Sequence, residues 1–439
     1  MSRPRELDDP RLPRSLWAAT AEPAPQLSSL TEELATDVVV IGGGFTGLSA
    51  AVHLGENGAD AILLEAGPVG HGASGRTGGQ CIPGLKYDPD QLEEMMGPDL
   101  GPRLVEAVGG GPALVFDLVE RHGIACDVQR EGWIQPAHCA SALTTITQRA
   151  GQWRARGADV EIIDAAETAR LTGATGYVGG WIDRRGGAVQ PLSYVRGLAR
   201  AAQRLGVRIY EHSPALSLTR RNGSWYVRTP KGAVTARRVI VATNAYSGPE
   251  LVAGLDRTIV PVYSFQIATK PLPDNVRRTI LGDGHVASDT RRLLRYFRVD
   301  RDGRLLMGGR GPFKAEPAVA DAASLTDAVQ QLFPQLERPE VDYVWSGRVG
   351  ITSDHMPRLH VPEDGLYVAI GYNGRGVALG TLMGRLLAGL ATGADVASVP
   401  FPVTGVRPLP FHALNRPVLE VMVRYYRWRD RQEDADSTR

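Results

Sequence analysis

A glycine-rich segment near the N-terminus has the residue types and the spacing that bind a diphosphate. Residues 42–47 read GGGFTG, which matches the pattern GxGxxG, and they directly follow the β-branched run 37–41. In such a pattern Gly42 permits the tight turn after a strand, Gly44 lets the backbone approach a pyrophosphate, and Gly47 lets the next helix pack closely on the strand. The N-terminus of that helix carries partial positive charge and would face the phosphates.

The elements that must position this loop can also be read from the sequence. Residues 48–57 are rich in helix formers, residues 61–64 form a second apolar run, and Glu65 ends that run. An acid at this distance accepts hydrogen bonds from the ribose hydroxyls of adenosine. Phe45 and Thr46, which lie between the last two glycines of the pattern, are further predicted cofactor contacts. The segment therefore predicts a Rossmann-type domain that binds a dinucleotide.

A second glycine-rich loop helps to distinguish between dinucleotides. Residues 70–80 read GHGASGRTGGQ and follow the second strand. Glu65 disfavours NADP because a carboxylate repels the 2′-phosphate, and a longer cofactor needs further amides and a hydroxyl beyond its pyrophosphate. The pattern favours FAD, and a flexible surface loop is the alternative. The predicted contacts in this region are Ala66, Gly72, Ala73, Ser74, Arg76, Thr77, Gly78, Gly79 and Gln80.

The composition is that of an ordinary globular protein. The 439 residues are 43% apolar and 22% charged, which allows sizeable cores in two domains. A formal net charge of +1 creates no global field that would favour nucleic acid. The 51 glycines exceed the average share of about 7%, as expected where the backbone approaches a large cofactor.

The N-terminal region and the cysteines predict the compartment. Residues 1–35 lack the apolar core of a signal peptide. Glycines interrupt the apolar stretch 38–54, so we expect no membrane-spanning segment. The three cysteines, Cys81, Cys126 and Cys139, show no metal-ligand spacing and cannot all pair. We therefore predict a cytoplasmic protein without a disulfide framework or a metal site.

The order of these motifs resembles that of the D-amino-acid oxidase superfamily of FAD-dependent oxidoreductases. The likeness is to the branch that contains gamma-glutamylputrescine oxidase and L-pipecolate oxidase. This branch carries an aspartate-led GxGxTGLS pattern, a GASGRNGGQ-like loop and an IPGLKYDP-like continuation, which residues 37–49, 72–80 and 82–89 match. Thr77 stands where the branch has asparagine, and a hydroxyl replaces only some hydrogen bonds of an amide. The resemblance covers most of the chain.

The resemblance implies further cofactor contacts later in the chain. Residues 239–245 look like the second strand and turn that contact FAD. Residues 371–377 read GYNGRGV and open a helix, whose positive N-terminus would face the pyrimidine edge of the flavin. A plain turn with a helix cap is the alternative. The implied contacts are Ala215 at the adenine, Thr243, Asn244, Gly374, Arg375, Gly376 and Val377.

The implied fold class is α/β (α+β), with a Rossmann-type FAD-binding domain of glutathione-reductase-like topology and a second domain built on an antiparallel sheet. Strands over 260–269, 293–299 and 304–307 would roof the flavin, and 322–333 has a helical pattern. The predicted segments are 36–90, 188–255 and 342–395 for the FAD-binding domain, 91–187 and 256–341 for the substrate domain, 1–35 for an N-terminal extension and 396–439 for a C-terminal tail.

The C-terminal tail is basic and aromatic. It contains Arg424, Tyr425, Tyr426, Arg427, Trp428, Arg429 and Arg431. Such a run can form a helix that contacts a membrane surface or another subunit. More commonly it is a solvated helix whose aromatic side chains pack on their own protein, and we expect this arrangement here.

In the resembling family the flavin carries the difficult chemical step. A neutral amine gives hydride from its α-carbon to flavin N5, and the resulting imine hydrolyses, so no catalytic triad is needed. A carboxylated substrate needs an arginine, for which Arg375 is the first candidate and Arg310 the second. Tyr372 and Tyr296 would line the substrate pocket or contact the amine. The alternative is that both only pack in the hydrophobic core.

Departures from the family's variants narrow the prediction. Some members of the family attach the flavin covalently through a cysteine in the C-terminal half, but this chain has no cysteine after Cys139. Others attach it through a histidine in the second glycine-rich loop, where this chain has Arg76. We therefore predict non-covalent FAD. Residues 304–308 lack the lysine that helps oxygen react in sarcosine oxidase. Lys270 is a basic residue close to this stretch in the sequence, but the sequence does not place its side chain at the flavin. The acceptor is therefore oxygen or an electron carrier such as a quinone. A flavin-binding subunit of a larger complex and a nicotinamide-binding protein are the competing functions.

Overall fold

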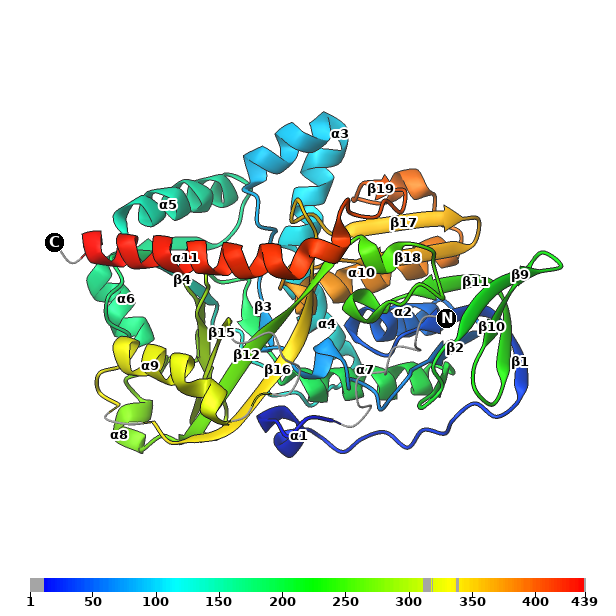
Figure 1. The fold of residues 1–439 in the computed structure, drawn as a ribbon, viewed down its shortest axis with the longest axis horizontal. Helices are drawn as coiled ribbons and strands as arrows, with labels where there is room; N and C mark the ends of the chain where they lie inside the picture. The colour runs from blue at the N-terminus through cyan, green and yellow to red at the C-terminus, as the bar shows by residue number, and fades with distance from the viewer. Residues whose placement is uncertain (1–11, 311–316, 318, 337–338, 438–439) are drawn as a thin grey trace.

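The first of two large sheets carries the predicted dinucleotide-binding unit (Figure 1). The computed structural model describes residues 12–310, 317, 319–336 and 339–437. The nine strands have the order β19-β17-β18-β11-β1-β2-β8, with β10 and β9 following from β11. The central strands β18, β11, β1, β2 and β8 run parallel. The strands are β1 (Glu33–Ile41), β2 (Ala61–Leu64), β8 (Arg208–Tyr210), β9 (Ser217–Arg221), β10 (Ser224–Arg228), β11 (Ala233–Val241), β17 (Arg358–Glu363), β18 (Leu366–Ile370) and β19 (Val403–Thr404).

The central strand β1 is buried on both faces, as its run of β-branched residues predicts. Val38 and Val40 belong to one hydrophobic core, and Val39 and Ile41 belong to another. The first core also contains helices α2 (Phe45–Glu56), α4 (Gly111–His122), α7 (Pro191–Arg204) and α10 (Gly376–Ala391). The β9–β10 hairpin contributes Trp225 to the second core.

The second sheet has eight strands in the order β16-β12-β15-β14-β13-β4-β6-β5. All neighbours are antiparallel except β13 and β4. Helix α9 packs on β12 and β15, and its core contains Phe265, Phe297 and Phe333. The elements are β4 (Trp133–Ala137), α5 (Ala140–Ala155), β5 (Val160–Ile163), α6 (Ala165–Thr172), β6 (Gly179–Asp183), β12 (Val260–Pro271), β13 (Val286–Ser288), β14 (Tyr296–Val299), β15 (Arg304–Arg310), α9 (Ala323–Leu332) and β16 (Val341–Ile351).

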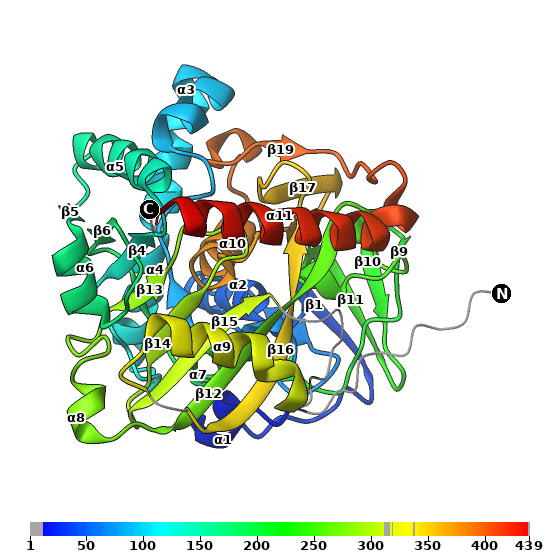
Figure 2. The same cartoon turned by 60° about the vertical axis from the view of Figure 1, so that its left-hand side comes forward.

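The remaining elements connect the sheets or lie on them. The long helix α11 crosses the front of the molecule (Figures 1 and 2). These elements are α1 (Leu16–Thr20), β3 (Gln80–Cys81), α3 (Pro89–Gly109), β7 (Gly187–Ala188), α8 (Asp274–Arg277), α11 (Asn415–Ser437) and the short 3₁₀ turns Ala73–Gly75, Asn244–Tyr246, Leu255–Arg257, Val319–Ala322, Val396–Ser398 and His412–Leu414. None of the helices in the described residues is long and apolar enough to cross a membrane.

The predicted fold class is confirmed, but sheet membership differs from the predicted boundaries. Strand β16, at the start of the predicted segment 342–395, pairs with β12 in the second sheet. Its Trp345 is buried in one cluster with Ala268 of β12 and Leu306 of β15, which belong to the same sheet. Conversely, α4 from the predicted segment 91–187 packs its apolar side on α10 beside the first sheet.

The structure also differs from two local predictions. The predicted strand 293–299 begins only at Tyr296, because the Asp289 carboxylate accepts the backbone N–H groups of Arg291 and Arg295 and holds a turn. In α11, Tyr425 and Trp428 are exposed. The expectation that these aromatic side chains pack on their own protein is therefore wrong for both.

Candidate functional site

A cavity of about 620 Å³ lies between the two large sheets and joins the predicted glycine-rich loops. One wall comes from the carboxyl ends of β1, β2 and β11 and from the loops that follow them. The opposite wall comes from β12, β14, β15 and β16. Ligands in α/β folds bind beyond the carboxyl ends of parallel strands, so this cavity is where a dinucleotide is expected.

The first glycine-rich loop is too close-packed for side chains. Gly42 has φ of 110°, and a Cβ there would lie 2.8 Å from the carbonyl oxygen of Ala242. A Cβ on Gly44 would lie 2.8 Å from Ser74 Oγ. A Cβ on Gly47 would overlap the carbonyl oxygen of Gly42. This is the close helix–strand packing predicted for Gly47. The loop therefore presents main-chain groups to the cavity.

The Glu65 carboxylate stands at the cavity wall and is held by main-chain groups. The N–H of Gly67 donates to Oε1 at 3.0 Å, and the N–H of Gly43 donates to Oε2. Nδ1 of His71 lies 3.2 Å from Oε1. Burial alone would raise the pKa of Glu65, but the hydrogen bonds and charge of His71 and the two amides lower it. An ionised carboxylate has further lone pairs that can accept from a ribose diol.

The second glycine-rich loop is fixed from outside by two tryptophans. Nε1 of Trp345 donates to the carbonyl of Arg76 at 2.9 Å, and Nε1 of Trp17 donates to the carbonyl of Thr77 at 2.7 Å. In a trans peptide the carbonyl and the following N–H point in opposite directions. Fixing the Thr77 carbonyl on the Trp17 side therefore turns the N–H of Gly78, which lines the cavity, away from Trp17.

The two loops and the third glycine-rich segment contact one another. The N–H of Phe45 donates to Ser74 Oγ at 3.0 Å, which joins the first loop to the second. Thr46 Oγ1 and the Tyr372 hydroxyl lie 2.7 Å apart, which joins the first loop to the third. A Cβ on Gly384 would meet the Thr46 carbonyl, so α10 packs directly on α2. The N-termini of both helices thus reach the same cavity.

These residues fit FAD on the geometry of this site. The cavity is lined by the three glycines at 42–44, by two helix N-termini that favour anionic groups and by an ionised acid at the predicted ribose position. Asn244 orders the third segment, because its Oδ1 accepts the N–H of Gly371 at 3.0 Å. The predicted contacts that line the cavity are Gly42, Gly44, Phe45, Thr46, Glu65, Ala66, Gly72, Ala73, Ser74, Arg76, Thr77, Gly78, Gln80, Ala215, Thr243, Asn244, Gly374 and Gly376.

Four predicted cofactor contacts lie behind the wall instead of in it. Gly47 packs α2 on β1, and Gly79 has φ of 77° next to the Val189 carbonyl. Val377 is buried in the core of α10. Arg375 is the N-cap residue of α10, and its Nη1 donates to the Pro83 carbonyl at 2.6 Å.

Arg375 thus has a main-chain acceptor in this structure, and its predicted role at a substrate carboxylate stays a prediction. Its guanidinium points out of the cavity toward the segment that follows the second loop. Burial lowers its pKa to about 9, and the residue as a whole is half-buried. Arg310, the second candidate, is the last residue of β15 and pairs with Ser264; its side chain lies outside the described residues.

Both predicted tyrosines line the cavity. Tyr296 is enclosed by two glycines, since a Cβ on Gly308 would overlap its ring and one on Gly78 would lie 2.8 Å from it. Its hydroxyl lies 2.9 Å from Ser264 Oγ. Burial raises the pKa of Tyr296 to about 12. Burial also raises the pKa of Tyr372, so both phenols are protonated at neutral pH.

Sequence reasoning missed several polar residues in the wall formed by the second sheet. Arg348 on β16 lines the cavity, with its guanidinium 4.8 Å from the ring centre of Tyr246 and 3.2 Å from the Tyr263 hydroxyl. Gln266 on β12 is buried and donates to the Arg76 carbonyl. Its place between the apolar residues Phe265 and Ile267 was the available signal for Gln266. Arg348, beside Trp345, was interpreted from the sequence as a structural residue.

The chain belongs to a family of flavoenzymes. It matches the DAO family model, described as FAD dependent oxidoreductase, over residues 37–390. This match and the geometry of the site define the protein as an FAD-dependent oxidoreductase, and they confirm the resemblance to the D-amino-acid oxidase superfamily.

Individual relatives agree with this assignment. The chain is 33% identical to gamma-glutamylputrescine oxidoreductase of Escherichia coli (strain K12), over 95% of this chain and 98% of that protein. Glycine oxidase from Geobacillus kaustophilus has a similar fold, with a TM-score of 0.71, 24% identity and coverage of 84% of this chain and 97% of that chain. L-proline dehydrogenase from P. horikoshii gives a TM-score of 0.69 at 18% identity, covering 84% and 96% of the two chains.

Proposed function

We propose that the enzyme oxidises the C–N bond of an amine or amino acid to an imine, which water then hydrolyses. FAD, when bound, supplies the hydride acceptor at N5. The observation that carries the proposal is the wall opposite the glycine-rich loops, where Tyr296, Gln266 and Arg348 face the same cavity. The names of gamma-glutamylputrescine oxidoreductase and glycine oxidase, two similar proteins, support this reaction class.

The protein's part in this reaction is to hold a neutral amine in a dry pocket. Burial disfavours the charged ammonium, and a neutral nitrogen keeps the lone pair that assists loss of hydride from the α-carbon. Tyr296 is fixed by Ser264 and stays protonated, so its hydroxyl can donate to a substrate acceptor but does not serve as a base at neutral pH.

We propose that Arg348, and not Arg375, binds the carboxylate of the substrate. Its guanidinium lies at the cavity between Tyr246 and Tyr263, and arginine binds carboxylates in a forked geometry. Arg310 remains a second candidate because its backbone ends the strand next to Ser264. Amino acids and amines that end in a carboxylate are therefore the proposed substrates.

The proposed electron acceptor is oxygen, with non-covalent FAD. An alternative acceptor, a quinone or a protein carrier, is supported by the absence of lysine from the described lining of the cavity. Lys270 is exposed and pairs with Glu340 at the far end of β12, so it does not replace the lysine that assists oxygen in sarcosine oxidase. Acid precipitation tests the linkage, because non-covalent flavin stays in the supernatant.

The experiment is anaerobic visible spectroscopy of the purified protein with a panel of compounds. The panel contains a polyamine conjugate, a secondary amine, glycine and a cyclic imino acid, each matched by its hydroxy analogue. We expect one amine to bleach the flavin and its hydroxy analogue to leave it unchanged. Recovery of colour on admitting air would assign oxygen as the acceptor. Bleaching by the hydroxy analogue alone would overturn the proposal.

A further inference from the structure

Helix α11 divides its charges between two faces. It crosses the front of the molecule in both views (Figures 1 and 2), and the acidic residues Asp430, Glu433 and Asp434 near its C-terminal end pair with the body of the protein. Asp430 accepts the N–H groups of Arg292 and Leu293 at 3.1 and 3.0 Å. Asp434 pairs with Arg291 at 2.8 Å. The body of the protein therefore neutralises these acids near the C-terminal end of the helix.

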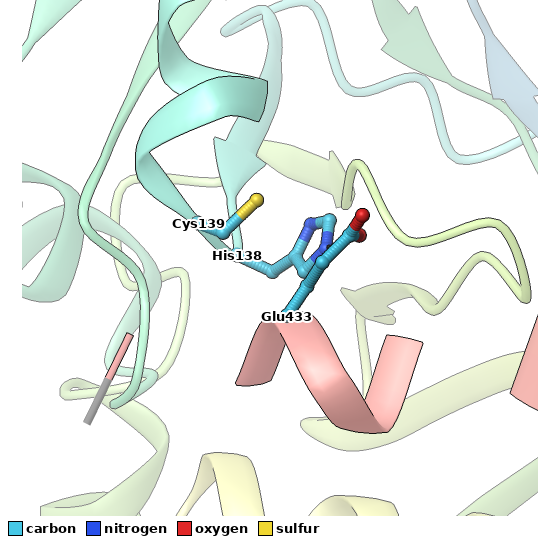
Figure 3. Close-up of side chains that lie close together, drawn as sticks. All are labelled: His138, Cys139 and Glu433. Carbon is cyan, nitrogen blue, oxygen red and sulfur yellow. Dashed lines mark hydrogen bonds and ion pairs between the residues drawn. The ribbon is translucent and has the colours of Figure 1, made fainter. Parts of the chain in front are cut away.

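Glu433 belongs to the same inward face and not to a metal centre. Figure 3 shows its carboxylate beside the His138 ring, with Cys139 next to them, and their ligand atoms lie within 4.8 Å of one another. However, Arg292 donates to both carboxylate oxygens of Glu433, at 2.9 Å to Oε1, and lowers its pKa to about 2. A cation would compete with this guanidinium, so the cluster serves to anchor α11.

The outward face of α11 is apolar at regular helical spacing. The apolar residues follow one another at intervals of three or four positions, which places them on a single stripe. They continue into the turn that precedes the helix. Their exposed fractions are 83% for Phe411, 55% for Leu414, 53% for Val418, 66% for Val421, 53% for Tyr425 and 54% for Trp428.

Exposed arginines accompany this stripe. Arg424, Arg427 and Arg431 are exposed, while the acids Asp430 and Glu433 are used on the inward face. The exposed side of the helix thus combines aromatic, aliphatic and basic side chains, with the arginines in excess of the exposed acid Glu420. That combination is typical of helices that lie in the interface of an anionic membrane, with aromatic rings at the depth of the headgroups.

A second copy of the chain fits this stripe poorly. In a coiled coil the positions beside the apolar seam meet the same positions of the partner, and here those positions include Arg424, Arg429 and Arg431. Pairing in either direction would place arginines against arginines, and like charges at such positions are destabilising. An anionic surface is complementary to the same side chains.

We propose that the outward face of α11, from Phe411 to Trp428, docks the enzyme on an anionic phospholipid surface. Asp430 also fixes the loop that carries Arg292 and Leu294, and both of these line the cavity. The docked face is therefore joined directly to one wall of the active site. The surface and the reaction are independent inferences, since docking requires only the folded chain.

The test is co-flotation of the full FAD-loaded protein with vesicles. We expect it to float with a mixture of phosphatidylcholine and phosphatidylglycerol, weakly with phosphatidylcholine alone, and less as salt rises. Changing Arg424 and Arg427 to Gln should weaken binding about fivefold per arginine. Trp428→Ser should weaken it by about tenfold or more, because about half of a large ring loses its apolar contact.

Matched controls and a second readout keep the test decisive. Met95→Ser removes an exposed apolar side chain on α3, and Arg278→Gln removes an exposed arginine beyond α8. Neither should change flotation, and all variants should keep their flavin content. No flotation, or equal flotation with both vesicle types, would overturn the proposal. A dimer in light scattering that Trp428→Ser dissociates would assign the stripe to a second copy instead.

Discussion

The two walls of the cavity are made from different parts of the polypeptide. On the side of the first sheet, backbone groups of the glycine-rich loops form much of the surface, and Cβ atoms added at residues 42–44 would collide with neighbouring atoms. On the side of the second sheet, side chains form it, chiefly Tyr296, Gln266 and Arg348. A wall of main-chain amides suits a cofactor that does not vary, whereas a wall of side chains can be altered residue by residue. The first wall should control flavin retention and the second should control substrate choice.

The largest expected effect comes from the first wall. Gly44→Val should abolish retention of FAD, because its side chain would enter the pyrophosphate path and displace Ser74, whose Oγ holds the N–H of Phe45. Flavin absorbance per folded protein measures this. Gly151→Ala on α5 is the matched control, since nothing lies within 4 Å of a Cβ there. Normal flavin content in folded Gly44→Val protein would remove this loop from the cofactor site.

The second wall should separate turnover from flavin content. Gly308→Ala should displace the Tyr296 ring, and overpacking of this kind costs about 1–3 kcal/mol. We expect kcat to fall about 10- to 100-fold while the flavin remains bound, as measured by steady-state kinetics and absorbance. In a Tyr296→Ala background the same substitution should have little further effect. Loss of flavin from Gly308→Ala would contradict the claim that only the first wall controls flavin retention.

The two walls also differ in how readily they can be predicted from the sequence, and for the same reason. The loops at 42–47 and 72–80 are contiguous, and their function requires glycine for steric reasons, so the pattern revealed both. The second wall combines β12, β14 and β16, which lie far apart in the chain and meet only in the folded sheet. Arg375 illustrates the limit of the pattern, because its neighbours Gly374 and Gly376 line the cavity while its own side chain donates to the Pro83 carbonyl. A residue's place in a loop does not determine where its side chain points.

Substrate choice provides a finer test of the second wall. Arg348→Met should raise KM for carboxylated substrates about tenfold or more, since a hydrogen bond to a charged group contributes about 1.5–3 kcal/mol. KM for an amine without a carboxylate should change little. Arg375→Met is the comparison variant, and we expect it to lower thermal stability without discriminating between the substrates. Equal KM changes for both substrate types in Arg348→Met would exclude a carboxylate contact.

The smallest expected effect concerns the support behind the first wall. Trp17→Phe keeps most of the ring packing against Trp345 but removes the donor to the Thr77 carbonyl. One hydrogen bond contributes about 1 kcal/mol, so FAD affinity should fall about fivefold, as measured by fluorescence titration of the apoprotein. Trp225→Phe, in the β9–β10 hairpin away from the cavity, controls for the loss of an indole. Because α1 precedes the predicted cofactor-binding segment, reduced affinity in Trp17→Phe alone would extend the cofactor site to the N-terminal extension, whereas equal affinity in both variants would confine the first wall to the glycine-rich loops themselves.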